Sequence, residues 1–532
     1  MPKPTKFPRW ANSDVNDPIS SAPNKREPSD EFKNTGQLRN QPLFRDHVNY
    51  EFNLINQWIE YLDTVNSTIT EDKTLYVSTT GSDVTGTGDI LLPFATPHKA
   101  IDSLIGSPIA TDALVTIFCA AGVYNFTESI TINHPYGERI HIIGDTLVGV
   151  KPFNFPIADW SSDRENPVVP ARGADEYYGT SGTLPVSETN VNRKLARGSD
   201  LSNNKVLVQA RWGTIFNFTG TSGIEIQGNN SIGLVDKIAM IGAWDGVLDV
   251  LELYQGIDSG DSTELEATPL NVTGGTAFIG GDVVVIGFEG DAVRARYGAA
   301  IVCADGFAVV NNMTKGFNAS GVSVIVANGS VAVGNGGNHY SAFASALVRA
   351  QDSKSSGSGV NGYSASNAGM LRVKGSASYG SGSHGYGLSV GSVLSGDISI
   401  SRGSKLAGIS MTAGCSSDAD SMIISDNGTQ GIQLEGSNFD GQTLTIENNG
   451  TIGISCKEGS SANVSLSTIQ NNDGDELDCR RTSNITITSS TIPSGSTVTA
   501  FKNSYIAIAN TAGVTYSPAY GVVGNDEALI NT

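Results

Sequence analysis

The second half of the chain repeats with a period of about 23 residues. In every repeat from residue 292 to residue 479, one position is large and apolar or aromatic: Val293, Phe317, Tyr340, Tyr363, Tyr386, Ile409, Ile432, Ile454 and Leu477. Two residues later a second apolar column holds Ala295, Ala319, Ala342, Ala365, Leu388, Met411, Leu434, Cys456 and Cys479. The position between the columns is polar, charged or glycine. This alternation predicts one strand per repeat with one buried face.

A polar column precedes the last eight of these nine strands and contains Asn312, Asn335, Ser358, Ser381, Ser404, Asn427, Asn449 and Asn472. Asparagine tolerates the left-handed turn conformation, and its amide can bond the backbone or the asparagine of the next layer. Apolar pairs such as Val331 and Val333 predict further short strands before this turn. In repeats of this kind, each strand lies directly above the equivalent strand of the previous repeat. The predicted fold class is therefore all-β, a right-handed parallel β-helix solenoid over residues 206–500, with Ile432 inside and Gln433 outside.

Composition excludes several classes of protein. Only 39% of the residues are hydrophobic and 16% are charged, whereas globular domains average about 45–50% and 25%. The net charge is −20 and no basic tract is present, so no nucleic-acid partner is expected. The sequence contains no run of 18 apolar residues, so no membrane insertion is expected. Residues 1–10 contain no secretory signal. Five cysteines without metal-ligand spacing are interpreted as small buried apolar residues.

Five segments are predicted from these patterns. Residues 1–72 form an N-terminal segment, 73–150 an end cap with the first rungs, and 151–290 irregular rungs with inserted loops. Residues 291–500 form the regular solenoid and 501–532 a C-terminal tail. Two inserted stretches, at about 150–205 and 241–272, are expected to emerge as surface loops.

The end cap carries a resemblance. Residues 75–105 contain Leu-Tyr-Val-Ser-Thr, then a short helix that Thr96 caps and Pro97 begins, with Ala100, Ile101 and Leu104 on its apolar face. This string resembles the opening of the pectate-lyase-like β-helix superfamily, where a strand and a helix close the first coil. The superfamily contains lyases, hydrolases, esterases and adhesins, so the resemblance implies the fold and leaves the chemistry open.

The N-terminal segment carries a second resemblance. Apolar residues spaced by four and three predict a helix at 48–65, either a single amphipathic helix or a short coiled coil: Val48, Phe52, Ile55, Ile59 and Leu62. Together with Trp10, Gly36 and Trp58, the segment resembles the leader by which bacteriophage tail fibres and tailspikes attach to the virion. The resemblance implies a homotrimeric receptor-binding protein of the virion tail. Residues 1–72 would bind other tail proteins, and the solenoid would bind a host surface glycan.

No catalytic residues are identified from the sequence, and no metal or other cofactor is predicted. A solvated, partly paired edge is the interpretation of the C-terminal acids Asp473, Asp475, Glu476 and Asp478 with Arg480 and Arg481. Another mixed cluster contains Glu289, Asp291, Arg294 and Arg296. His98, His339 and His384 have no evident serine or cysteine partner. The candidate ligand-binding residues are the loop aromatics Trp160, Tyr177, Tyr178 and Trp244, which can stack on sugar rings or pack their own loops. A tailspike depolymerase, either a glycoside hydrolase or a polysaccharide lyase, remains the alternative function.

Overall fold

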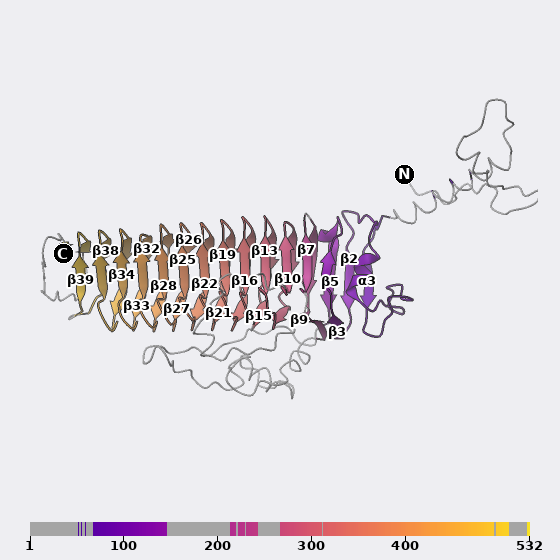
Figure 1. Cartoon of the computed structure of the whole chain (residues 1–532), viewed down its shortest axis with the longest axis horizontal. Helices are drawn as coiled ribbons and strands as arrows, with labels where there is room; N and C mark the ends of the chain where they lie inside the picture. The colour runs from indigo at the N-terminus through magenta and orange to yellow at the C-terminus, as the bar shows by residue number, and fades with distance from the viewer. Residues whose placement is uncertain are drawn as a thin grey trace, which may run out of the picture. The chain divides into compact units, whose positions relative to one another are not determined.

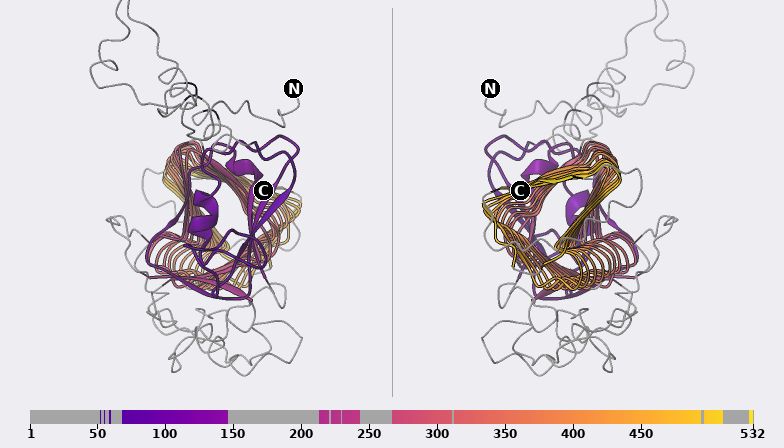
Figure 2. Two further views of the ribbon diagram at one scale, coloured as in Figure 1. Left: turned by 90° about the vertical axis from the view of Figure 1, so that its right-hand side faces the viewer. Right: turned by 90° about the vertical axis from the view of Figure 1, so that its left-hand side faces the viewer.

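A computed structural model describes residues 68–145, 213–219, 222–228, 230–242, 267–310, 312–493, 496–509 and 529–531, with three further residues in a helix, Phe52, Ile55 and Ile59. Two compact units divide the chain: residues 1–73 with 104–113, and residues 74–103 with 114–532. The larger unit contains the solenoid, whose coils follow one another along the long axis of Figure 1. Viewed along that axis, the stacked coils have a three-sided outline (Figure 2).

Each regular coil contributes one strand to each of three parallel sheets, which the chain visits in the order A, B, C. Sheet A has 13 described strands: β4 (Ile130–Ile132), β7 (Ile224–Gln227), β10 (Leu270–Thr273), β13 (Val293–Arg296), β16 (Phe317–Ser320), β19 (Tyr340–Phe343), β22 (Tyr363–Ser366), β25 (Tyr386–Ser389), β28 (Ile409–Thr412), β31 (Ile432–Glu435), β34 (Ile454–Lys457), β37 (Leu477–Arg480) and β39 (Val498–Phe501).

Sheet B is the longest, with 16 described strands: β1 (Lys73–Val77), β2 (Val115–Cys119), β5 (Ile140–Gly144), β8 (Ser231–Asp236), β11 (Thr276–Ile279), β14 (Ala300–Cys303), β17 (Val324–Val326), β20 (Leu347–Arg349), β23 (Met370–Arg372), β26 (Val393–Ser395), β29 (Ser416–Asp418), β32 (Asn438–Gln442), β35 (Ser461–Ser465), β38 (Asn484–Thr488), β40 (Tyr505–Ala509) and β41 (Leu529–Asn531).

Sheet C has 12 described strands: β3 (Gly122–Phe126), β6 (Thr214–Phe218), β9 (Ala239–Ile241), β12 (Val284–Ile286), β15 (Ala308–Val310), β18 (Val331–Val333), β21 (Lys354–Ser356), β24 (Ala377–Tyr379), β27 (Ile400–Arg402), β30 (Ile423–Ser425), β33 (Thr445–Glu447) and β36 (Thr468–Gln470). The predicted fold class, a parallel β-helix solenoid, is confirmed. β2 to β5 lie within residues 73–150, where the first rungs were predicted, and β40 and β41 extend the rungs beyond residue 500.

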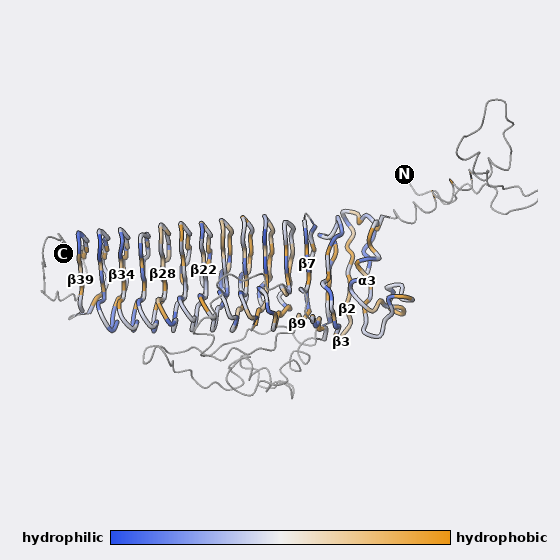
Figure 3. The backbone as a smooth tube through the Cα atoms, in the orientation of Figure 1, coloured by the Kyte–Doolittle hydropathy of each residue, from blue (hydrophilic) through white to orange (hydrophobic). Residues whose placement is uncertain are grey.

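The apolar columns lie inside the solenoid as predicted. Every residue of the two columns on sheet A is 3% exposed or less. Hydrophobic and hydrophilic segments alternate along each coil in Figure 3. The five cysteines are buried and free, which confirms their interpretation as small core residues.

The short helix α3 (Pro97–Asp102) begins as the sequence predicts. The Thr96 hydroxyl accepts a hydrogen bond from the Lys99 N–H at 3.2 Å, and Pro97 occupies the first turn. Pro97, Ala100 and Ile101 are buried. The Asp83 carboxylate fixes the start of the helix by accepting bonds from the Thr96 N–H and hydroxyl, at 3.1 and 2.8 Å. A 3₁₀ turn, η1 (Gly137–Arg139), precedes β5.

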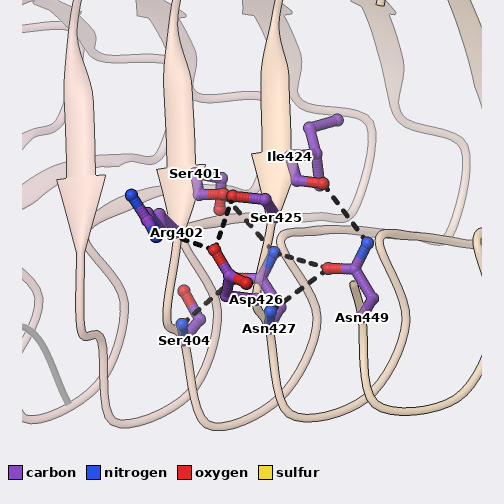
Figure 4. A network of polar contacts seen from close by, with 8 residues as sticks. All are labelled: Ser401, Arg402, Ser404, Ile424, Ser425, Asp426, Asn427 and Asn449. Carbon is purple, nitrogen blue, oxygen red and sulfur yellow. Dashed lines mark hydrogen bonds and ion pairs between the residues drawn. The ribbon is translucent and has the colours of Figure 1, made fainter. Parts of the chain in front are cut away.

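The polar column forms ladders at the corner between sheets C and A (Figure 4). The Asn449 Oδ1 accepts bonds from the N–H and Nδ2 of Asn427, at 3.2 and 2.9 Å, and Asn472 does the same for Asn449. The predicted amide ladder is therefore confirmed. The left-handed conformation lies one residue earlier in the chain, at Asp426, whose φ is 55°. Asparagine thus occupies its column because its amide reaches the next layer.

Candidate functional site

A column of charged and polar side chains runs along the outer face of sheet B and is the clearest candidate site in the described chain. Its members face outward at one position per layer and occupy equivalent positions in strands β20 to β35: Arg349, Arg372, Ser395, Asp418, Asp440 and Asn463. We call these six residues the charged column. Because parallel strands lie about 4.8 Å apart, the column presents guanidinium donors and then carboxylate acceptors in a straight line.

Two corner aspartates enlarge the acidic end of the charged column. Asp420 lies two residues beyond Asp418, and Asp397 occupies the equivalent corner position one layer earlier. The corner carboxylates bind the backbone: the Gln442 N–H donates to the Asp420 Oδ1 at 2.8 Å. The Asn463 Nδ2 donates to the Asp440 Oδ1 at 3.0 Å. None of the four aspartates forms an ion pair among the described residues. They therefore retain acceptor capacity for an external ligand.

The electrostatics single out Asp418. Desolvation raises the pKa of its carboxyl above the ordinary value, and the charges of Asp420, Asp397 and Asp440 raise it further. Since Asp418 is exposed, repulsion by like charges is the cause that distinguishes it from other surface acids. A carboxyl whose pKa is raised beside further carboxyl groups is the kind of pairing on which acid–base cleavage of glycosidic bonds depends. No group of metal-holding side chains is found in the described ranges.

Sequence reasoning missed the charged column, although a signal was present. Asp397 and Asp420 are 23 residues apart, and Asp418 and Asp440 are 22 apart, which matches the repeat. The columns that the sequence analysis describes belong to the strands of sheet A and to the corner before them. The aspartates belong to sheet B and its following corner, so those columns do not contain them.

The mixed cluster at Asp291 is a structural network of sheet A. The Asp291 carboxylate accepts bonds from the Thr314 hydroxyl at 2.9 Å and the Asn318 Nδ2 at 2.7 Å, both from the next layer. The Arg294 Nε donates to the Asn271 Oδ1 at 3.2 Å. These contacts connect neighbouring coils and give Asp291 a role within the fold.

The interpretation of the C-terminal acids as a solvated edge was wrong for two of them. Glu476 is 4% exposed and Asp478 is fully buried, although Asp478 points to the outer face of sheet A. The Arg480 Nε lies 2.7 Å from the Asp478 Oδ1. Burial raises the pKa of Glu476, and a hydrogen bond from Asn472 opposes that rise. Arg481 forms an ion pair with Glu458 at the surface.

One histidine has a serine partner that the sequence did not reveal. The His339 Nδ1 lies 2.8 Å from the Ser355 Oγ, and its Nε2 accepts the Asn335 N–H at 3.1 Å. Both side chains are fully buried inside the solenoid. The pair therefore ends the short ladder of Asn312 and Asn335 and has no access to a substrate.

The four loop aromatics predicted to bind sugar, Trp160, Tyr177, Tyr178 and Trp244, lie outside the described residues, as do most of the two inserted stretches. Their role stays a prediction. No helix in the described ranges is long and apolar enough to cross a membrane.

Comparisons with known proteins find similarity among solved structures. No family model matches the sequence, and no curated protein matches it. The structure is similar to the catalytic domain of a GH87 α-1,3-glucanase in complex with nigerose, at 10% identity and a TM-score of 0.35 over 78% of this chain. It is also similar to the catalytic unit of the GH87 α-1,3-glucanase of Streptomyces thermodiastaticus strain HF3-3, at 11% identity and a TM-score of 0.45 over 83% of this chain and 69% of the other.

A third similar structure is the A-module of the mannuronan C-5 epimerase AlgE4 of Azotobacter vinelandii, at 12% identity and a TM-score of 0.32 over 60% of this chain and 88% of that module. The chain spans 63% of the length of the first glucanase structures. Because the TM-scores lie below 0.5, the architecture rests on the strand order and register of the chain itself.

Proposed function

We propose that this chain is a receptor-binding tail fibre or tailspike protein of a bacteriophage, and that the charged column contacts a polysaccharide of the host surface. The observation that carries the proposal is the straight array of donors and acceptors on sheet B. A linear polymer of hydroxyl-bearing units can bond to successive layers, and a hydrogen bond to a charged group contributes about 1.5–3 kcal/mol. The leader-like residues 1–72 and the loop aromatics Trp160, Tyr177 and Tyr178 complete the proposal as its attachment segment and its sugar-stacking surface.

Self-association is part of this proposal. The helical residues Phe52, Ile55 and Ile59 follow a three-and-four spacing, and each is exposed over about half of its surface, at 51%, 51% and 47%. Apolar residues at this spacing bury themselves against other copies of the same helix in a coiled coil. We therefore propose a homotrimer, carried on the virion tail through residues 1–72.

Adsorption to cells tests the binding role. Purified protein is incubated with bacterial strains that carry or lack surface polysaccharide, and the bound fraction is measured. We expect the double substitution Asp418→Asn with Asp440→Asn to weaken adsorption at least about 10-fold. The matched control is Glu435→Gln, an exposed acid on sheet A of a neighbouring coil. Equal adsorption of the Asp418/Asp440 variant and the wild type would remove the charged column from the proposal.

The division of labour has its own test. Deletion of residues 1–72 is expected to leave a folded particle that still adsorbs to cells and no longer joins the tail. Trp160→Ala, Tyr177→Ala and Tyr178→Ala are expected to weaken adsorption. Adsorption that disappears with the leader and ignores all three aromatic substitutions contradicts this division.

Depolymerisation of the same polysaccharide is the second candidate function, favoured by the raised pKa of Asp418 beside three carboxylates. Released reducing ends or unsaturated products are measured on isolated surface polysaccharide. If the protein is a hydrolase, Asp418→Asn lowers the rate about 100-fold or more, and the wild-type rate falls as rising pH deprotonates Asp418. If Asp418→Asn forms reducing ends or unsaturated products at the wild-type rate, Asp418 is excluded as the general acid.

A further inference from the structure

An apolar stripe runs along the corner between sheets A and B. The first outward column of sheet B contains Val324, Leu347, Met370 and Val393 in register. Beside this column lie Val322, Phe343 and Val390, which are 67%, 42% and 52% exposed, while Val393 is 36% exposed. We call these seven residues the seam. Contiguous exposed apolar surface of this kind marks an interaction site on a soluble protein.

The seam is also free of charge. The five successive corner segments, residues 320–324, 343–347, 366–370, 389–393 and 412–416, contain no Asp, Glu, Lys or Arg, although the chain has a net charge of −20. Charged residues return at this corner in the following coils, with Glu435, then Lys457 and Glu458, then Arg480 and Arg481. The neutral part of the corner therefore coincides with its apolar part.

Backbone conformation gives an independent indication. Val322 and Val390 adopt left-handed φ angles of 57° and 52°. This conformation is costly for a β-branched side chain, by about 1–3 kcal/mol, and glycine adopts it freely. Glycine does occupy the corner at Gly391 and Gly414. Both valines are largely exposed, so burial within the chain does not offset this cost.

We infer that copies of this chain associate along the seam, around a common axis parallel to the solenoid. At such an axis each residue meets the same residue of the other copies, so every charge would face a like charge. A seam that is neutral and apolar over four coils satisfies this condition, and the charged corner from Glu435 onward does not. The inference rests on the self-association proposed above and adds the surface through which it occurs.

The corner between sheets B and C supplies a matched control. Ile398 and Leu466 are also exposed, at 59% and 60%, and have φ angles of 55° and 53°. Ser421 and Thr443 occupy the corners of the two coils between them, so these two apolar residues are isolated. They share the exposure and the strain of the valines without forming a stripe.

Sedimentation velocity on the full-length protein tests the inference. The seam variant Val322→Lys with Val390→Lys is compared with the control Ile398→Lys with Leu466→Lys. Lysine is not β-branched, so neither variant adds backbone strain, and circular dichroism confirms folding. We expect self-association to weaken at least about 100-fold in the seam variant only. A seam variant that assembles like the wild type overturns the seam and leaves the homotrimer standing, whereas a monomeric wild type overturns both.

Cysteine cross-linking gives a direct readout of proximity. Because the five native cysteines are buried, a surface cysteine is the reactive thiol. Under mild oxidation the Val322→Cys variant is expected to form a disulfide between position 322 of one copy and position 322 of another. The linked pair appears as a doubled mass on a non-reducing gel. Ile398→Cys is expected to remain unlinked. Equal cross-linking of both variants, or of neither while the protein is assembled, contradicts the seam.

Discussion

Two stretches of the solenoid fill the same coil in different ways. In the aromatic coils, Phe317, Tyr340, Tyr363 and Tyr386 stack inside sheet A with ring centroids 4.8 to 4.9 Å apart. The tyrosine hydroxyls lie about 3 Å from serine hydroxyls ten residues earlier, as in the 2.9 Å contact of Tyr363 with Ser353. In the isoleucine coils, Ile432 and Ile454 take the same column, and Met422 and Leu444 stand ten residues earlier. A large polar ring is thus matched with a small polar partner, and a smaller apolar side chain with a large apolar one.

The corners between sheets C and A differ in parallel. In the coils of Tyr363 and Tyr386 a glycine with positive φ, Gly357 or Gly380, precedes a buried serine, whereas the coils of Phe317 and Tyr340 have Asn312 and Asn335 at the serine position. The hydroxyls of Ser358 and Ser404 have no partner within the described chain. In the isoleucine coils Asp426 or Asn448 takes the left-handed position and an asparagine ladder follows. The comparison shows that the size of the core side chains and the residues at the corner can both change from coil to coil. The backbone path of the coil stays the same, because the register of the paired strands sets it.

The largest expected effect tests the shared interior. Ile432→Asp places a charge in a fully buried position without a partner and should destabilise the fold by more than about 4 kcal/mol, as measured by chemical unfolding. Gln433→Asp, one residue away on the outer face, should change stability by about 0.5 kcal/mol or less. Similar losses for the two variants would contradict the assigned faces.

The ladder should be worth more than the serine corner. Asn449→Ala removes the acceptor of two Asn427 bonds and leaves buried amide groups unsatisfied, for an expected loss of about 2–4 kcal/mol in the free energy of unfolding. Ser381→Ala, at the equivalent position of an aromatic coil, removes one hydroxyl contact and should cost about 1 kcal/mol or less. Equal costs would show that the ladder adds nothing to the corner.

The end of the ladder should respond to pH. Glu476 occupies a position that is glycine in the preceding coils, and it accepts a bond from Asn472. Its raised pKa means that the folded chain holds this proton more tightly than the unfolded chain. The stabilisation is therefore complete below the ordinary glutamate pKa and is lost as pH rises through the raised value. The Tm of the wild type relative to Glu476→Gln should fall as the pH rises above the ordinary pKa of glutamate. A constant difference would remove Glu476 as the titrating group.

The smallest expected effect converts one corner into the other. Ser404 precedes the ladder, and its N–H already donates to the Asn427 Oδ1 at 3.0 Å. Ser404→Asn supplies an amide that can repeat the contact of Asn427 with Asn449. We expect the free energy of unfolding, measured by heat or by denaturant, to rise by about 0.5–1.5 kcal/mol in Ser404→Asn. The control Ser404→Ala should show no increase. A loss of stability in Ser404→Asn would show that this coil lacks room for the amide.

The sequence by itself determined the fold of this protein. Burial at positions such as Ile409 and Leu434 follows from a one-dimensional repeat, because each coil contacts its neighbours at a fixed spacing along the chain. The helix cap at Thr96 is equally local, since a hydroxyl reaches an N–H three residues away. The asparagine column was also legible, because its amides bond across one repeat.

Only the tertiary structure decided which charged side chains lie next to one another and which of them are exposed. Asp418 and Asp440 are one repeat apart in the chain, and the pairing of β29 with β32 in register makes them neighbours on the outer face of sheet B. Ser455 and Asp478 face outward in the alternation pattern and are nevertheless fully buried. Exposure on an outer face depends on which side chains of adjacent layers and corners lie over a position. Those contacts join residues far apart in the chain, so the period of one strand cannot specify them.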